Sequence, residues 1–242
     1  MRTHCFPPSA FLRRLAFGAC AMFLAIGAQA QGGPVVGRWD SAMADFAKAD
    51  VARRPGDGGV LFVGSSSIRL WQRLPQDFSN VPVLINRGFG GSTMADCRQL
   101  VRQLVLQYKP RHVLVYAGEN DLAEGRSPAE VLDSFRGFVD VVRQELPDVR
   151  IDYISIKPSP LRVQLLPQVR EANRLLAAYV GELDNAGFVD VFSAMVDESG
   201  VPRADLFGPD RLHMNDAGYA LWRQVLAQRV SAPQVEASEG AE

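Results

Sequence analysis

The fold is decided by one stretch, HVLVYAGENDLAEGRSPAEVLDSFRGFVDVV, which covers residues 112–142. Its first five residues form a short run rich in valine, which is typical of a buried strand. Ser127-Pro128-Ala129-Glu130 then supplies an N-cap, a proline at the first helical position and a capping-box glutamate. Val131, Phe135, Phe138 and Val142 follow at helical spacing. The stretch therefore predicts a buried strand, a polar connection and an amphipathic helix.

The same alternation of strand and helix runs through the chain on both sides of this stretch. Four more strand-like runs lie at 60–63, 83–85, 151–155 and 188–192. A helix is expected from Trp39 to Ala52, with Trp39, Ala42, Met43 and Phe46 on its packing face. Strands that alternate with helices favour a parallel sheet. We therefore expect an α/β fold: a three-layer α/β/α sandwich around a five-stranded parallel sheet, with its ligand crevice beyond the carboxyl ends of the strands.

Length and composition are those of an ordinary globular protein. The chain has 242 residues, of which 47% are hydrophobic and 22% charged, and a domain takes about 150 residues as a soft prior. No internal repeat and no second domain are evident, so residues 31–230 are predicted to form one domain. The 26 basic and 27 acidic residues give a net charge of −1. A chain this balanced offers no large cationic surface for phosphates, which argues against nucleic acid as a partner.

The first thirty residues have the pattern of a secretory signal peptide. Three arginines precede or open an apolar run over residues 15–28, and a small-residue site, Ala28-Gln29-Ala30, follows. The run is shorter than the roughly 20 residues that span a bilayer, so no stable membrane anchor is expected after cleavage. Cys20 is a poor lipidation site because the sequence after it stays apolar. We predict a periplasmic or secreted protein, with a disordered tail at 231–242.

Cleavage at this site would leave Cys97 as the one cysteine of the mature chain. A single cysteine forms no internal disulfide. Cys97 also shares the apolar face of a predicted helix with Met94, Leu100, Val101 and Leu104. This position favours a buried packing residue over a nucleophile.

Unusual polar residues gather after three of the strands. They are Gly64-Ser65-Ser66-Ser67, the segment 86–92, and Gly118-Glu119-Asn120-Asp121. A fourth segment, Asp210-Arg211-Leu212-His213, precedes the last helix, for which Asn215 or Asp216 is the expected N-cap. A serine hydroxyl becomes a nucleophile when an imidazole takes its proton and a carboxylate orients that imidazole. The residue types needed for this chemistry are thus present at loop positions.

In these four segments the sequence resembles the SGNH/GDSL hydrolases, and the match covers nearly the whole mature chain. The resemblance implies that Ser66 is the nucleophile and that Asp210 and His213 are the acid and base. It also implies an oxyanion hole made by the backbone N–H of Ser66, by Gly91 and by Asn120. Ser65 stands where this family usually has aspartate, which leaves Ser65 and Ser67 as alternatives to Ser66.

Other enzyme classes fit the sequence poorly. Gly64-Ser65-Ser66-Ser67-Ile68 lacks the second glycine of an α/β-hydrolase elbow. No dinucleotide or nucleotide-phosphate glycine motif is present. Catalytic zinc usually takes three protein ligands, whereas the predicted mature chain has two histidines, His112 and His213. Neither a cofactor nor a metal is implied.

These observations together predict an exported serine esterase that acts on a small-acyl, acetyl-type ester, of a small molecule or a carbohydrate, through an acyl-enzyme. Two alternatives stay open. One is a cell-envelope sugar O-acyltransferase with the same triad. The other is a binding module with this fold and an idle triad. The sequence leaves the acyl chain, the alcohol and the oligomeric state undetermined.

Overall fold

The structure is a computed structural model that describes residue 1 and residues 35–230. The predicted signal peptide at 1–30 and the predicted tail at 231–242 lie outside the described residues, apart from Met1. Both stay predictions. The account below concerns the unit that contains residues 35–230.

Five strands form one parallel sheet in the order β2-β1-β3-β4-β5. Their bounds are β1 Val60–Gly64, β2 Leu84–Gly88, β3 His112–Tyr116, β4 Arg150–Ile154 and β5 Ala186–Val189. All residues of β1 and β3 are buried, as expected where helices cover both faces of a parallel sheet. The predicted sheet and its five strands are confirmed.

Nine α-helices and four 3₁₀ segments connect the strands within the described residues. The α-helices are α1 Val35–Ala52, α2 Ser66–Arg69, α3 Leu74–Asp77, α4 Met94–Gln99, α5 Val101–Leu104, α6 Glu119–Ala123, α7 Pro128–Glu145, α8 Leu166–Gly181 and α9 Asp216–Leu226. The 3₁₀ segments are η1 Leu106–Tyr108, η2 Pro160–Leu165, η3 Ser193–Met195 and η4 Ala204–Leu206. The first helix thus begins before the predicted Trp39, and Asn120 lies in a short helix rather than a loop.

The capping signals act as predicted. The Ser127 hydroxyl accepts from the Glu130 backbone N–H (3.3 Å), and the Ser127 backbone N–H donates to the Glu130 carboxylate (2.7 Å). This is the reciprocal capping box that starts α7. Of the two N-caps expected for α9, the structure selects Asn215, whose side chain accepts from the Gly218 N–H (3.1 Å).

Strand β2 corrects one expectation. The segment 86–92 was expected to follow the second strand, yet Asn86, Arg87 and Gly88 belong to β2. Polar side chains are tolerated there because they are paired. Asn86 donates to the Ile68 carbonyl (2.8 Å) and accepts from Gly88 N–H (2.9 Å), while Arg87 forms a buried ion pair with Asp50 (2.5 Å). Strand β3 has the predicted bounds, and β1, β4 and β5 differ from prediction by one to three residues at their ends.

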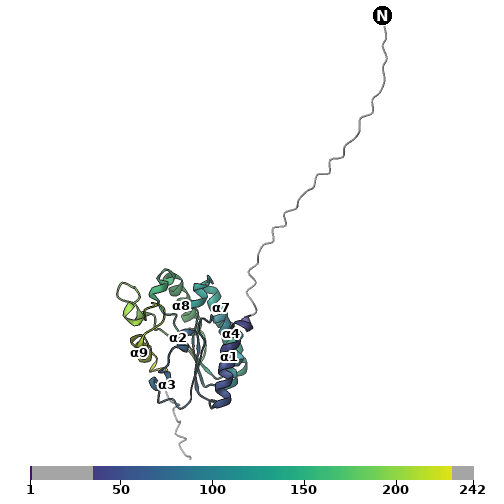
Figure 1. Cartoon of the computed structure of the whole chain (residues 1–242), viewed down its shortest axis with the longest axis vertical. Coiled ribbons are helices and arrows are strands. Elements are labelled where there is room, and N and C mark those ends of the chain that lie inside the picture. The colour runs from purple at the N-terminus through teal and green to yellow at the C-terminus, as the bar shows by residue number, and fades with distance from the viewer. Residues whose placement is uncertain (2–34, 231–242) are drawn as a thin grey trace, which may run out of the picture. The chain divides into compact units, whose positions relative to one another are not determined.

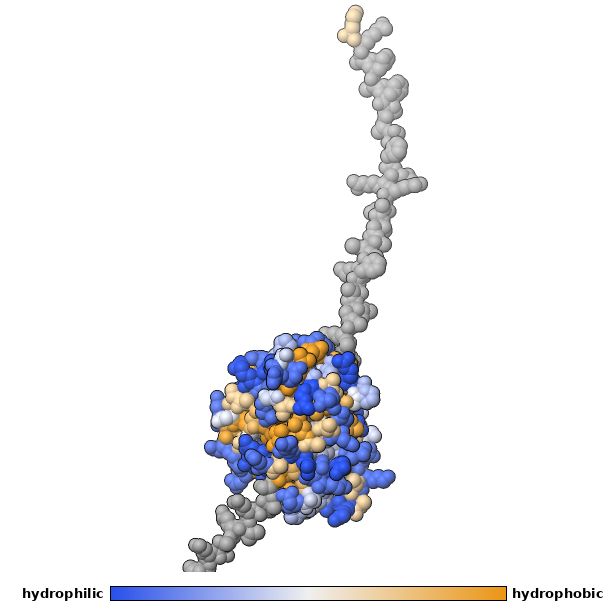
Figure 2. Space-filling view, turned by 90° about the vertical axis from the view of Figure 1, so that its left-hand side faces the viewer, coloured by the Kyte–Doolittle hydropathy of each residue, from blue (hydrophilic) through white to orange (hydrophobic). Residues whose placement is uncertain are grey.

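The sheet separates two hydrophobic cores. Helices α1, α4, α5, α7 and α8 pack on one face, and α2, α3 and α9 pack on the other; Figure 1 shows α1, α4 and α7 across the sheet from α3 and α9. The face that carries α3 and α9 is mainly hydrophilic, with hydrophobic side chains near its middle (Figure 2). None of the helices in the described residues is long and apolar enough to cross a membrane.

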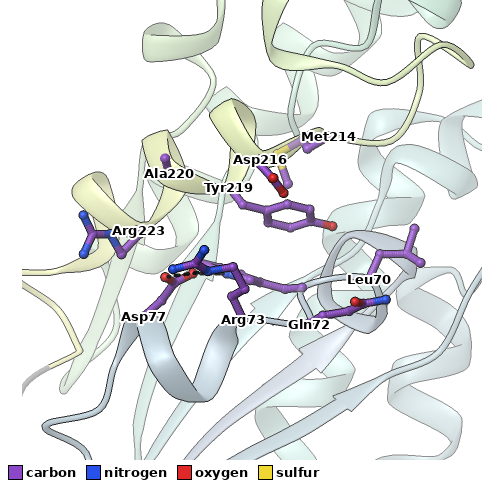
Figure 3. Close-up of a pocket in the computed structure, with 10 residues that line it drawn as sticks. Leu70, Gln72, Arg73, Asp77, Met214, Asp216, Tyr219, Ala220 and Arg223 are labelled. Atoms are coloured by element: carbon purple, nitrogen blue, oxygen red, sulfur yellow. Dashed lines mark hydrogen bonds and ion pairs between the residues drawn. The ribbon is translucent and has the colours of Figure 1, made fainter.

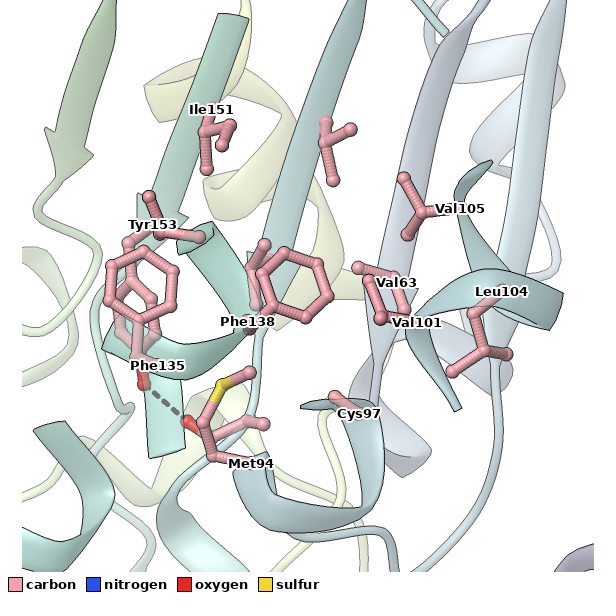
Figure 4. Close-up of a cluster of buried hydrophobic side chains, with 14 of the residues drawn as sticks. Val63, Met94, Cys97, Val101, Leu104, Val105, Phe135, Phe138, Ile151 and Tyr153 are labelled. Carbon is pink, nitrogen blue, oxygen red and sulfur yellow. Dashed lines mark hydrogen bonds between the residues drawn. The ribbon is translucent and has the colours of Figure 1, made fainter. Parts of the chain in front are cut away.

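Cys97 lies inside the first core, fully buried, among side chains of α4, α5, α7 and the sheet (Figure 4). Burial raises the pKa of its thiol, and the carboxylates of Asp121 and Asp96 raise it further. A thiol held in its protonated form inside a core is unreactive. The predicted packing role of Cys97 is therefore confirmed.

Candidate active site

The order of the strands creates the crevice in which the candidate residues meet. From β1 the chain crosses to β2 on one side, and from β2 it crosses back to β3 on the other side of β1. Open parallel sheets bind ligands at such a switch point, beyond the carboxyl ends of the strands. Ser66 follows β1 and Asn120 follows β3. Sheet topology thus brings two segments that are distant in sequence to the same point.

The turn after β1 presents the Ser66 side chain. Gly64 has φ +143°, and a Cβ on it would lie 1.8 Å from the Tyr116 carbonyl oxygen, so this position requires glycine. Ser65 donates its N–H to that same oxygen (3.0 Å), and its own carbonyl accepts from Ile68 and Arg69. Ser65 and Ser67 are buried, whereas Ser66 at the start of α2 is partly exposed.

Ser66, His213 and Asp210 form one hydrogen-bonded chain. His213 Nε2 lies 3.0 Å from Ser66 Oγ, and His213 Nδ1 lies 2.6 Å from Asp210 Oδ2. Of the three adjacent serines, the structure therefore places Ser66 against the imidazole. The other oxygen of Asp210 accepts the backbone N–H groups of Leu212 (3.0 Å) and His213 (2.9 Å).

The hydrogen bonds to Asp210 also fix its charge state. The N–H groups of Leu212 and His213, and then the His213 side chain, lower the pKa of Asp210 to about 2. The carboxylate is therefore ionised across the neutral range, and it orients the imidazole with Nε2 toward Ser66. The loop itself is held by the Gly208 N–H to His213 carbonyl bond (2.8 Å) and the Leu161 N–H to Arg211 carbonyl bond (2.9 Å).

Three possible donors to an oxyanion belong to residues that line one pocket: Ser66, Gly91 and Asn120. Within the described residues, no protein acceptor takes the backbone N–H of Ser66 or of Gly91. Gly91 has φ +83°, the left-handed region that favours glycine. Asn120 donates one N–H of its amide to the Ser92 carbonyl (2.9 Å). A primary amide has two N–H groups, so the second remains for a ligand.

Hydrogen bonds join the three strand ends to one another. Phe89 N–H donates to the Gly64 carbonyl (2.9 Å), which ties the loop after β2 to the end of β1. The Asn120 to Ser92 bond ties the same loop to α6, and the Ser65 to Tyr116 bond ties β1 to β3. The segments that carry Ser66, Gly91 and Asn120 are thus held in fixed positions relative to one another.

A pocket of about 530 Å³ opens onto these residues. Its lining includes Ser66, Gly91, Asn120 and His213, together with Arg38, Trp39 and Asp45 of α1, Arg69 of α2 and Arg162 of η2. The helix predicted from Trp39 to Ala52 is expected to pack on the side of the domain, and the apolar face of α1 does so. Helix α1 also forms a wall of the pocket. Trp39 packs edge-on against Phe89, with 5.0 Å between the ring centroids, and Arg38 donates to the Gly91 carbonyl (3.3 Å).

Behind the pocket lies a buried ionic cluster that sequence reasoning missed. Lys157 and Glu119 form an ion pair (2.6 Å), and Ser159 donates to Glu119 (2.5 Å). Burial raises the pKa of Glu119, but the charges of Lys157 and Arg162 outweigh that effect and bring its pKa below the ordinary value. Burial also lowers the pKa of Lys157, which Glu119 opposes. Lys157 and Ser159 follow β4, so reading the polar residues after this strand, as after the first three, would have found them.

A second pocket, of about 660 Å³, is lined by residues 70–73, which join α2 to α3, and by residues of α3 and α9, and contains neither Ser66 nor His213 (Figure 3). Tyr219 lies across it (Figure 3), and its ring packs at a tilt against Trp71, with 5.4 Å between the ring centroids. Its rim includes Arg73, Asp77 and Arg223. None of the candidate triad or oxyanion residues faces this pocket.

Within residues 35–230, no group of three or more His, Cys, Asp and Glu side chains is placed to hold a metal ion.

A hydrogen-bonded serine, histidine and aspartate beyond the carboxyl ends of a parallel sheet is the arrangement of a serine hydrolase, and the family match adds that the bond it cleaves is an ester. The chain belongs to the GDSL-like lipase/acylhydrolase family, whose model matches residues 34–221. The predicted family and enzyme class are confirmed. No curated protein matches the chain.

Solved structures share the fold. A GDSL-like lipase from Bacteroides thetaiotaomicron VPI-5482 is 19% identical, with a TM-score of 0.65, and the match covers 78% of this chain and 96% of that one. An acetylxylan esterase from Geobacillus stearothermophilus, solved as a catalytic mutant, is 16% identical, with a TM-score of 0.61 and coverage of 74% and 96%. A protein from Streptococcus pneumonia is 17% identical, with a TM-score of 0.71 and coverage of 81% and 94%.

Proposed function

We propose that this protein is an exported serine esterase that hydrolyses small-acyl, acetyl-type carboxylic esters through an acyl-enzyme on Ser66. The observation that carries the proposal is the continuous contact from Ser66 Oγ through His213 to Asp210, with distances of 3.0 and 2.6 Å. Ser66 and His213 line a pocket, so this hydrogen-bonded chain is not enclosed in the core.

Acylation begins when His213 Nε2 takes the Ser66 proton and Oγ attacks the ester carbonyl carbon. The carbonyl oxygen becomes an oxyanion, which accepts from the N–H groups of Ser66 and Gly91 and from the Asn120 amide. The tetrahedral intermediate collapses as the C–O bond of the alcohol breaks, and the imidazolium gives its proton to the departing oxygen. Asp210 stabilises the imidazolium without taking its proton.

Deacylation repeats these steps with water. His213 takes a proton from the water, whose oxygen attacks the acyl carbon. The second tetrahedral intermediate then releases the carboxylic acid, and the proton returns from His213 to Ser66 Oγ. A sugar hydroxyl in place of water would give the acyltransferase reaction with the same residues, so the acceptor decides between the two activities.

The lining of the pocket supports a small acyl group. Only Trp39, Ala42 and Leu212 among the lining residues are apolar. A long acyl chain would need much more apolar surface, because each buried CH₂ contributes about 0.8 kcal/mol. The similar fold of an acetylxylan esterase agrees with acetylated carbohydrates as substrates.

The test is a burst assay on the mature protein with p-nitrophenyl esters of two to eight acyl carbons. We expect a burst of p-nitrophenol equal to the enzyme concentration, an acetylated Ser66 by mass spectrometry, and falling kcat/KM as the chain lengthens. Ser66→Ala is the negative control. Absence of both a burst and steady hydrolysis would support the idle binding module, and acyl transfer to added sugars that outpaces hydrolysis would support the acyltransferase.

Export has its own test, because it rests on the sequence pattern of residues 1–30. Intact-mass analysis of material secreted or released from the periplasm should give a chain that begins at Gln31. A soluble product that keeps residues 1–30, or that carries a lipid on Cys20, would contradict the proposal.

A further inference from the structure

Arg162 contacts the acceptor side of the Asn120 amide. It lies in η2, with 20% of its side chain exposed. Its Nη1 donates to Asn120 Oδ1 (3.1 Å) and to the Glu119 carbonyl (3.3 Å). On its other side the Asn120 amide donates to the Ser92 carbonyl (2.9 Å). Both ends of the amide are therefore fixed, since a flipped amide would place donor against donor at Arg162 and acceptor against acceptor at Ser92.

The guanidinium of Arg162 is itself fixed by the buried cluster. Its Nη1 lies 3.5 Å from Glu119 Oε1. Glu119 is 6% exposed and also accepts from Lys157 (2.6 Å), Ser159 (2.5 Å) and Tyr116 (3.1 Å). A carboxylate held by four groups has little freedom to move, so Arg162 has a rigid partner.

The cluster places a positive charge next to the Asn120 amide. Glu119 supplies one negative charge, and Lys157 and Arg162 supply two positive charges. The carboxylate of Asp210 also acts on Lys157, so the positive charge in direct contact with the Asn120 amide is that of Arg162. Fixed charges and dipoles of this kind stabilise an oxyanion because they need no reorganisation when it forms.

We propose that Arg162 is a positioning residue of the oxyanion hole. It fixes the free N–H of Asn120 toward the reacting carbonyl, and it polarises the amide so that this N–H becomes a stronger donor as the oxyanion develops. The proposal rests on the proposed esterase function. It adds a residue that touches neither the scissile bond nor the triad and acts through Asn120.

The first test separates kcat from KM for p-nitrophenyl acetate hydrolysis. Arg162→Ala should lower kcat by about 10- to 100-fold with KM nearly unchanged, because a misplaced donor costs up to about 10²-fold. Arg162→Lys keeps the charge without the forked geometry and should recover part of the loss. Arg174→Ala is the matched control, since Arg174 is exposed and pairs with Glu171 on α8; its kcat should equal that of the unmodified enzyme.

The decisive test is a double-mutant cycle with Asn120→Ala. If Arg162 acts through Asn120, Arg162→Ala should have little further effect in the Asn120→Ala enzyme. Multiplicative losses in the double variant, or a rise in KM alone, would overturn the proposal. If thermal denaturation shows that Arg162→Ala does not fold, Arg162→Gln replaces it, and full kcat in that variant would overturn the proposal equally.

The same assay distinguishes the two failures. An unmodified enzyme that shows neither a p-nitrophenol burst nor steady hydrolysis of any of these esters refutes the esterase proposal, and the role of Arg162 fails with it. A normal burst together with an unaffected Arg162→Ala enzyme refutes the role of Arg162 alone.

Discussion

Replacing Asn120 by alanine tests the oxyanion hole most directly. The structure offers three donors to the oxyanion: two backbone N–H groups, of Ser66 and Gly91, and the side chain of Asn120. Only the last can be removed by mutation without altering the backbone. Loss of one such donor costs roughly 3–4 kcal/mol in the transition state. We therefore expect kcat to fall by about 10²–10³-fold, with little change in KM, since the donor strengthens mainly as charge develops.

The same substitution also has a structural cost that must be measured separately. It removes the bond from Asn120 to the Ser92 carbonyl and leaves the Arg162 guanidinium without that acceptor. A buried acceptor left unpaired costs about 1–3 kcal/mol of stability. The free energy of unfolding should therefore fall by an amount in this range, well below what would unfold a typical domain.

The assay is steady-state and pre-steady-state hydrolysis of p-nitrophenyl acetate at a temperature well below the measured unfolding midpoint. Both the burst rate and the steady rate should fall, because both tetrahedral intermediates carry an oxyanion. Asn80→Ala, a change of the same type at an exposed position, is the control. An Asn120→Ala enzyme with normal kcat and a raised KM would show that Asn120 binds the ground state, and the oxyanion assignment would fail.

Four further single substitutions and one double variant test the triad and its support. Ser66→Ala and His213→Ala should each remove nearly all turnover, and the double variant should be scarcely worse, as for residues that act as one unit; multiplicative losses in kcat would contradict this. Asp210→Asn should lower kcat/KM no more than either single variant. Because the pKa of Asp210 is lowered to about 2, its carboxylate stays charged above about pH 4, so a fall of kcat/KM toward acid above that pH should persist in Asp210→Asn. Loss of this acidic limb from the pH profile of the variant would show that Asp210 itself titrates there. Gly64→Ala should abolish folding or lower the unfolding midpoint strongly, since its Cβ would meet the Tyr116 carbonyl at 1.8 Å, and a normal circular-dichroism melt would refute that reading.

The linkage of Asp210 to stability has a definite sign. A carboxyl whose pKa is lower in the folded state stabilises the fold above its unfolded pKa of about 3.9, and that contribution is lost as the pH falls toward 2. Because the Asp210 side chain is about half exposed, solvent screens the effect, and the main consequence of the shift is catalytic.

Local signals explain which parts of the fold could be predicted. The strand His112–Tyr116 and helix α7 follow from residues that lie next to one another, because the apolar run, the N-cap and the capping box all act within a few residues. The end of β2 could not be found in this way. Arg87 is accommodated in a strand because it forms an ion pair with Asp50, which is far away in the sequence. The hydropathy pattern around Arg87 does not indicate that partner.

In the candidate site, too, the residues with a sequence motif could be predicted and those placed by tertiary packing could not. Ser66, Asp210 and His213 carry the family's motif, so their proximity could be expected, and the structure brings them into contact. The pocket wall formed by Arg38 and Trp39, and the contact of Arg162 with Asn120, depend on how α1 and η2 pack against the strand ends. These residues carry no motif, so only tertiary structure reveals them.

Ser65 shows how the site tolerates its departure from the family pattern. Where the family usually has aspartate, this chain has a buried serine whose side chain makes no cap bond to α2. The turn is held by backbone bonds instead: Ser65 N–H to the Tyr116 carbonyl, and Phe89 N–H to the Gly64 carbonyl. Neither bond involves the side chain at position 65, so this support of the turn does not depend on a carboxylate there. The ionic support of the oxyanion hole comes from the opposite side, through Glu119 and Arg162.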